Sequence, residues 1–237
     1  MTQRKTLFPT LLFALFSLSC AAIEQATVHA LIVVDIDNTL GVQEPNPPAF
    51  TAEHIVKVPG DQEGDFYFYR GAIDFLRTVF RWREEAVMFD KKIEVALFTM
   101  AFGQRNEIVR NFIEDQLGLA RNTLAVYDFS HAVFSEDLIG QYRSHDPGLS
   151  LGWRQYLDSL DKPIAFVEKL PDGLKYQKDL SKLLPFYTGL ELLNIRLVDD
   201  NKLAVPSPQN SQLIVFGPNM DYTAATETLR HFLVSVY

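Results

Sequence analysis

Two aspartates follow an apolar run near the start of the chain, in the segment Val33-Val34-Asp35-Ile36-Asp37-Asn38-Thr39. The run predicts a buried strand, and a strand buried on both faces of a parallel sheet stays apolar until it ends. Asp35 and Asp37 are therefore expected at its carboxyl end, where open α/β sheets bind ligands. One carboxylate there can act as a nucleophile and the other as an acid and base, with a divalent cation offsetting their charge. A turn without chemistry is the alternative, since Asp and Asn are ordinary turn residues.

Two further apolar strands end in polar residues of complementary kinds. One ends at Thr99 and the other at the pair Asp199 and Asp200, and Lys178 opens a helix-like segment shortly before that pair. If the three strands are parallel neighbours, these groups meet in one crevice. Phosphoryl transfer needs such a set, because a nucleophile attacks phosphorus while donors and an oxygen-ligated Mg²⁺ offset the charge of the phosphoryl oxygens.

The elements that position these residues alternate along the chain, which predicts an α/β fold with a doubly wound parallel sheet. The expected strands are residues 31–34, 93–98, 124–129, 164–167, 195–198 and 213–216. The expected helices are residues 71–83, 106–117, 153–160 and 223–236, with Gly118 closing the second of them. A small hairpin of residues 55–58 and 66–69 is expected before the first helix, and residues 41–48 are expected to form a loop because they are rich in Pro and Asn.

The first 22 residues have the layout of a secretory signal peptide, because Arg4 and Lys5 precede a short apolar run that small residues follow. The run is too short for a comfortable membrane span. We therefore expect an exported protein whose mature domain comprises residues 23–237. The only cysteine, Cys20, lies in the cleavage region, so attachment to a membrane is expected only if Cys20 carries a lipid. An uncleaved anchor or a buried N-terminal helix is the alternative.

Composition excludes several classes of function. The chain has 237 residues, of which 47% are hydrophobic and 22% are charged, as in an ordinary single domain with a core. The net charge of −8 argues against nucleic acid as a partner. The five histidines lack the spacing of a zinc site. The segment Gly148-Leu149-Ser150-Leu151-Gly152 matches the nucleophile elbow of serine hydrolases but lacks the apolar strand that must precede it.

Taken together, these motifs resemble the haloacid dehalogenase superfamily of phosphatases. The most similar branch contains the phosphatases of the RNA polymerase II C-terminal domain and the nuclear-envelope phosphatase of the Dullard type, which are also called NLI-interacting-factor-like proteins. The resemblance covers roughly residues 28–237, with the motifs in the order of the family. The matching segments are residues 33–40, 69–76, 96–99, 178–183 and 197–201.

The resemblance implies a Mg²⁺-dependent phosphomonoester hydrolase that works through an aspartyl-phosphate. Asp35 would be the nucleophile and a metal ligand. Asp37 would protonate the leaving oxygen, then activate water, and its backbone carbonyl would face Mg²⁺. Asp200 is favoured as the direct metal ligand and Asp199 as its supporting partner, and sharing of this role by the pair is the alternative.

The resemblance also implies that Thr99 binds a phosphoryl oxygen and that Lys178 offsets negative charge on the nucleophile and the phosphate. Lys169 and Lys175 compete with Lys178 for that role, and the sequence Lys178-Asp179-Leu180 favours Lys178. Thr39 is expected to brace the loop rather than to touch substrate.

The favoured substrate is a phosphorylated protein, on Ser/Thr or on Tyr, because an open crevice admits a peptide side chain. The stretch between Thr99 and Lys178 is longer than in compact relatives, so residues 130–174 are a possible cap-like insertion at the pocket. The alternatives are an exported nonspecific acid phosphatase acting on small phosphomonoesters, and a non-catalytic binding or effector module. Arg105, Arg110 and Arg121 are expected to be solvated helix charges rather than a phosphopeptide clamp.

Overall fold

The computed structural model describes residues 26–61, 63–101, 103–128, 177–202, 204–216 and 222–237. The predictions made for residues 1–22, including Cys20, lie outside the described residues. So do the possible cap-like insertion at residues 130–174, the helix and strand expected within it, and Lys169 and Lys175.

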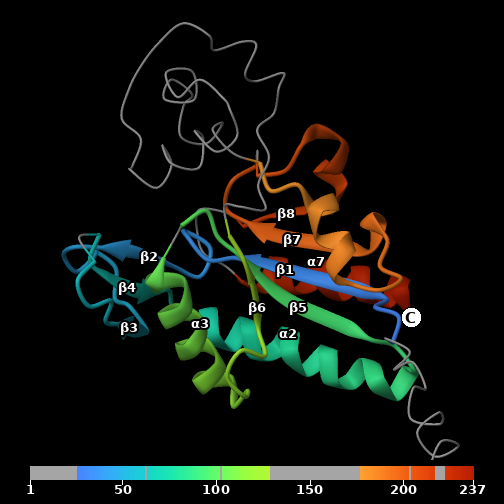
Figure 1. Ribbon diagram of the computed structural model, residues 1–237, viewed down its shortest axis with the longest axis horizontal. Coiled ribbons are helices and arrows are strands. Elements are labelled where there is room, and N and C mark those ends of the chain that lie inside the picture. Colours follow the sequence, from blue (N-terminus) through green and yellow to red (C-terminus); the bar gives the residue numbers. More distant parts are fainter. Residues whose placement is uncertain (1–25, 62, 102, 129–176, 203, 217–221) are drawn as a thin grey trace, which may run out of the picture.

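A five-stranded parallel sheet forms the centre of the fold, with the strand order β6-β5-β1-β7-β8 (Figure 1). Its strands are β1 (Ala30–Asp35), β5 (Ile93–Phe98), β6 (Ala125–Tyr127), β7 (Ile195–Asp199) and β8 (Leu213–Val215). Strand β1 is central, and its Val34 pairs with Leu97 of β5 and with Val198 of β7. All five of these strands lie at predicted positions, and the predicted α/β sheet is confirmed.

Both faces of β1 are buried, and alternate side chains enter two different cores. Ile32 and Val34 pack with three helices, α2 (Ala72–Ala86), α3 (Gln104–Leu117) and α7 (Tyr222–Val236). Leu31 and Val33 pack on the other face with residues of two 3₁₀ helices, η4 (Leu180–Phe186) and η5 (Leu192–Asn194). This double burial is the reason that the strand is apolar until Asp35.

The helices follow the predicted periodicity. In α2 the buried side chains Ile73, Leu76, Val79 and Phe80 recur at helical spacing, and a 3₁₀ turn, η1 (Val87–Phe89), follows. Helix α3 ends at Gly118, which adopts a φ of 67° and caps the helix in the left-handed conformation that glycine tolerates best. None of the helices in the described part of the chain is both long and apolar enough to span a lipid bilayer.

A small antiparallel sheet is inserted between β1 and α2, with the order β2-β4-β3. Its strands are β2 (Gly41–Glu44), β3 (His54–Val56) and β4 (Asp65–Phe68). The pairing of β3 with β4 confirms the predicted hairpin. The prediction of a loop at residues 41–48 is wrong for Gly41–Glu44, which pair with β4. This edge strand is only partly buried and lacks apolar alternation, so pairing rather than its own sequence pattern makes it a strand.

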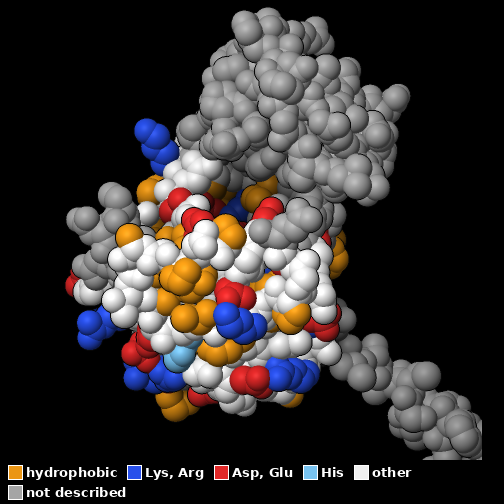
Figure 2. All heavy atoms as spheres, turned by 90° about the vertical axis from the view of Figure 1, so that its left-hand side faces the viewer, with side chains coloured by type: hydrophobic (Ala, Val, Ile, Leu, Met, Phe, Trp, Pro, Cys, Tyr) orange, Lys and Arg blue, Asp and Glu red, His pale blue; other side chains and the backbone are white. Residues whose placement is uncertain are grey.

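The surface on the side of the inserted sheet carries both signs of charge. On the face shown in Figure 2, acidic and basic side chains are interspersed with apolar ones and do not gather in one basic patch. A polyanion would therefore meet acidic groups as well as basic ones on this face.

Candidate active site

The site lies where the direction of the strand order reverses. From β1 the chain passes to β5 and β6 on one side of the sheet and then to β7 and β8 on the other, so the carboxyl ends of β1 and β7 flank the crevice in which α/β sheets bind ligands. A cavity of about 640 Å³ opens there. Its lining includes five of the predicted site residues, namely Asp35, Asp37, Lys178, Asp199 and Asp200.

A second cavity, of about 690 Å³, lies near Ala26 and Lys92, at the amino end of β5. Within the described ranges, no three of its histidine and acidic side chains lie close enough together to hold a metal ion. The chemistry-bearing residues are therefore concentrated at the smaller cavity.

Lys178 bridges two aspartates at the bottom of the site. Its ammonium donates to Oδ1 of Asp35 and, at 2.5 Å, to Oδ2 of Asp199. Only 4% of Lys178 and 3% of Asp35 are exposed. Burial opposes the charge of Lys178, but the two carboxylates outweigh it and raise the pKa of the lysine. Burial raises the pKa of Asp35 well above its ordinary value, against the attraction of Lys178 and with the help of Asp199 and Asp37. The expected contact between this lysine and Asp35 is present, and its role toward a phosphate stays a prediction.

Thr39 braces the site as predicted. Its hydroxyl donates to Oδ2 of Asp35 at 3.0 Å and accepts the backbone N–H of Asp200 at 3.0 Å. The Tyr222 hydroxyl donates to the Thr39 carbonyl at 2.6 Å. These bonds hold the ends of β1 and β7 at a fixed distance and orient the Asp35 carboxylate.

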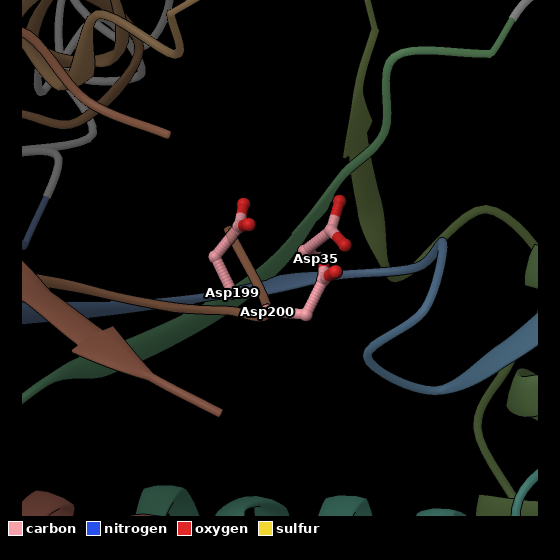
Figure 3. A group of neighbouring side chains, drawn as sticks. All are labelled: Asp35, Asp199 and Asp200. Atoms are coloured by element: carbon pink, nitrogen blue, oxygen red, sulfur yellow. The ribbon is translucent and has the colours of Figure 1, made fainter. Parts of the chain in front are cut away.

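The carboxylates of Asp35, Asp199 and Asp200 gather at the ends of two neighbouring strands (Figure 3), with one oxygen from each lying within 4.8 Å of the others. Burial, followed by repulsion from Asp199, raises the pKa of Asp200 to about 6. One lysine cannot neutralise three carboxylates, so a cation fits here. An all-oxygen donor set suits a hard ion such as Mg²⁺.

Within this group Asp199 is already engaged, since it binds Lys178 and accepts the backbone N–H of Asn201 at 2.8 Å. Asp200 is the exposed member of the three. This difference favours Asp200 as the direct ligand and Asp199 as its support.

The Asp37 carboxylate lines the same cavity and is held by two residues outside this group of three. The Thr99 hydroxyl donates to its Oδ2 at 2.7 Å, and the Arg105 guanidinium donates to both of its oxygens. Thr99 also accepts the backbone N–H of Ala101 at 3.0 Å. Thr99 is thus brought to the site through Asp37, and its binding of a phosphoryl oxygen stays a prediction.

Arg105 is a residue of the candidate site that the sequence analysis missed. The expectation that it is a solvated helix charge is wrong, because it is only 2% exposed and forms an ion pair with Asp37. Arg121 is half exposed, as expected, and Arg110 is partly buried. A signal was present in the spacing, since Arg105 lies one and two turns before Val109 and Ile113 on the buried stripe of α3. The predicted helix started at residue 106, so Arg105 was left outside it and its place on the buried stripe was not recognised.

A comparison with models of protein families finds no match for this sequence, and a comparison with curated proteins finds no significant similarity. Function is therefore inferred from the residues of this site and from their geometry.

Proposed function

We propose that this protein is a Mg²⁺-dependent phosphomonoester hydrolase of the haloacid dehalogenase superfamily that works through an aspartyl-phosphate on Asp35. The observation that carries the proposal is the bridge from Lys178 to Asp35 and Asp199 at the reversal point of the sheet, with Asp200 beside it. A carboxylate held by a lysine, next to a set of cation ligands and lining a cavity, can attack a phosphate monoester.

The architecture supports the assignment to that superfamily and to its branch of C-terminal-domain phosphatases. Asp35 and Asp37 follow the central strand, a small sheet is inserted before α2, and the active-site lysine precedes the strand that supplies the metal carboxylates. The sequence motifs that resemble the family therefore occupy neighbouring positions in space.

Mg²⁺ would be held by Asp35 and Asp200, with Asp199 supporting them and the Asp37 carbonyl facing the ion. Bound there, it would neutralise phosphoryl oxygens as they approach the carboxylates. The fit rests on three clustered oxygen ligands, and burial followed by repulsion from Asp199 raises the pKa of Asp200 among them.

The side chains of the protein divide the reaction into two steps. In the first, an oxygen of Asp35 attacks phosphorus, the bond from phosphorus to the leaving oxygen breaks, and Asp37 gives that oxygen a proton. In the second, Asp37 takes a proton from water, whose oxygen attacks phosphorus and releases inorganic phosphate and the Asp35 carboxylate. Lys178 offsets negative charge in both steps, and Thr99 is proposed to bind a phosphoryl oxygen.

A phosphorylated protein is the favoured substrate, on Ser/Thr or on Tyr. The inserted sheet beside the mouth of the site offers a surface against which a peptide could lie. A nonspecific acid phosphatase acting on small phosphomonoesters is the second candidate, and the signal-like residues 1–22 favour it because they predict export. Turnover of phosphopeptides compared with nucleotides and sugar phosphates separates the two.

The test is hydrolysis of para-nitrophenyl phosphate by the full chain with and without Mg²⁺. Asp35→Asn removes the nucleophile and should lower kcat by roughly 10⁴-fold or more. Asp74→Asn, an exposed aspartate of α2 paired with Arg77, is the matched control and should leave the rate unchanged. Equal rates in the unaltered protein and in Asp35→Asn would show that Asp35 is not the nucleophile. Binding of Mg²⁺ and of a phosphopeptide without any turnover would favour the non-catalytic module.

A further inference from the structure

Arg105 and Asp37 form a two-point contact at the edge of the site. Nη1 of Arg105 lies 3.1 Å from Oδ2 of Asp37, and Nη2 donates to Oδ1. Nη1 also lies 3.4 Å from the hydroxyl of Thr99, which itself donates to Asp37. A planar guanidinium that binds both carboxylate oxygens fixes the orientation of the carboxylate as well as its position.

Two parts of the fold restrict Arg105. Its guanidinium lies over the ring of Phe66, with its central carbon 5.0 Å from the ring centroid, and Phe66 is a fully buried residue of the inserted sheet. The loop that leads from β5 into α3 is fixed by Asn106, whose side chain donates to the Ala101 carbonyl at 2.8 Å. Arg105 therefore has little freedom to leave Asp37.

Asp37, which Arg105 binds, is far less enclosed than Asp35. About a third of its side chain is exposed, whereas 4% of the Asp35 side chain is, and Asp37 lines the cavity together with Asn38 and Met100. Without a partner, such a carboxylate on a short side chain could adopt several rotamers. A proton donor must reach the leaving oxygen at hydrogen-bond distance, so its rotamer matters for the rate.

We infer that Arg105 is a positioning residue, which holds the Asp37 carboxyl group where it can pass a proton to the leaving oxygen of the substrate. The inference rests on the proposed function, because it concerns the first step at the same site. The inserted sheet thereby acquires a role in the reaction, since the ring of its Phe66 packs against the guanidinium of Arg105.

This role makes a specific prediction about leaving groups. When the bond from phosphorus to oxygen breaks, the leaving oxygen keeps the electron pair and takes the proton of Asp37. An acidic phenol such as para-nitrophenol can depart without that proton, whereas a less acidic alcohol or phenol cannot do so easily. A displaced Asp37 should therefore slow esters of poor leaving groups far more than esters of good ones.

The experiment compares phenyl phosphate with para-nitrophenyl phosphate, two substrates of similar shape, in the full chain with Mg²⁺. Arg105→Met should lower kcat/KM for phenyl phosphate by about 100-fold, and for para-nitrophenyl phosphate by less than about 10-fold. Arg105→Lys should recover part of the loss, since one of the contacts to Asp37 can form again. Arg121→Met, which changes an exposed arginine just beyond α3, should leave both values unchanged.

A double variant tests whether Arg105 acts through Asp37. In the Asp37→Asn protein, adding Arg105→Met should leave the ratio of the two kcat/KM values unchanged, because residues that act as a unit are not additive. Equal losses on both substrates in Arg105→Met, or a rise in KM alone for both, would overturn the inference and indicate that the arginine binds the phosphate. Hydrolysis that Asp35→Asn does not abolish would instead overturn the proposed function, and this inference with it.

Discussion

At the scale of single residues, the site combines three neighbouring carboxylates with one bridging lysine. Asp35 and Asp199 are almost fully buried, and both depend on Lys178 for a countercharge. The ion pairs of Lys178 are with Asp35 and Asp199, and the pKa of Asp200 is raised by burial and then by repulsion from Asp199. Excess negative charge at such a site destabilises the folded protein when no cation is bound. Functional sites commonly carry a cost in stability of this kind.

Asp200→Asn should stabilise the protein in the absence of Mg²⁺. The pKa of Asp200 rises from an unfolded-state value near 3.8 to about 6 in the folded protein, so ionisation of this group destabilises the folded state. The destabilisation sets in as pH rises from about 3.8 through about 6 and is complete above that window. The asparagine should therefore raise the free energy of unfolding by on the order of 1 kcal/mol at pH 8, after allowance for screening of an exposed group.

The measurement is urea unfolding of both proteins at pH 8 and pH 3 in the presence of a chelator. The difference between them should vanish at pH 3, where the carboxyl group is protonated in both the folded and the unfolded states. A loss of stability in the variant at pH 8 would contradict the prediction.

Lys178→Met should have the opposite effect. It leaves Asp35 and Asp199 buried without a countercharge, and breaking such a buried pair costs about 3–5 kcal/mol of unfolding free energy. The loss should be smaller at pH 5 than at pH 7, because Asp35, whose pKa is already raised, can then take up a proton. Lys57→Met removes an exposed lysine that pairs with Asp65 at the surface and should have little effect in the same urea titration. A loss in Lys178→Met no larger than in this control would contradict the assigned bridge.

At the scale of elements, a tight loop joins the active-site strand to the inserted sheet. Asn38 adopts a φ of 59°, and its backbone N–H donates to the Gly41 carbonyl at 2.7 Å. Gly41 begins β2 and pairs with Phe68 of β4. The position of Asp37 is thus set partly by how closely β2 approaches β4.

Gly41→Ala should disturb that approach. An added Cβ would lie 2.3 Å from the Tyr67 carbonyl oxygen and 2.7 Å from the Phe66 ring, so β2 must shift. We expect a loss of about 1–3 kcal/mol in unfolding free energy, as for other overpacked sites, together with reduced phosphatase activity. Gly60→Ala is the control, since its Cβ meets nothing within 4 Å and only the backbone is strained. Gly60→Ala should lower the free energy of unfolding by about 1 kcal/mol without lowering kcat. If Gly41→Ala and Gly60→Ala change kcat equally, the loop has no role in catalysis.

At the scale of the whole molecule, the topology assembles the site from segments that are far apart in sequence. The reversal of strand order brings β1 and β7 side by side (Figure 1). Residues 35, 178 and 199 meet there, although more than half of the chain separates the first from the other two. The proposed cation site is assembled only in the folded chain, so a bound cation should stabilise the fold.

Mg²⁺ should therefore raise the melting temperature. With a dissociation constant on the order of 1 mM, 10 mM Mg²⁺ would contribute about 1.4 kcal/mol, which is roughly 3–6 °C for a domain of this size. Differential scanning fluorimetry at constant ionic strength measures this shift. Asp200→Asn should abolish the shift, whereas an equal shift in that variant would show that the ion binds elsewhere.

The sequence by itself determined the sheet and most of the site. Apolar runs that end in Asp35, Thr99 or Asp199 predict buried parallel strands, because a strand covered on both faces has polar residues only where it ends. Position at a strand end then predicts that the side chains meet, since the carboxyl ends of parallel strands share one edge. Lys178 was favoured from its local sequence, and it contacts Asp35 in the structure.

Only the tertiary structure decided the environment of Arg105 and the existence of β2. An arginine in a polar stretch of helix is usually solvated, and its burial here depends on Phe66, a residue about forty positions earlier in the chain. Likewise, Gly41–Glu44 form a strand because β4 offers them backbone partners. Burial of a charge and pairing of an edge strand both depend on contacts between distant segments, and no local pattern of residues encodes such contacts.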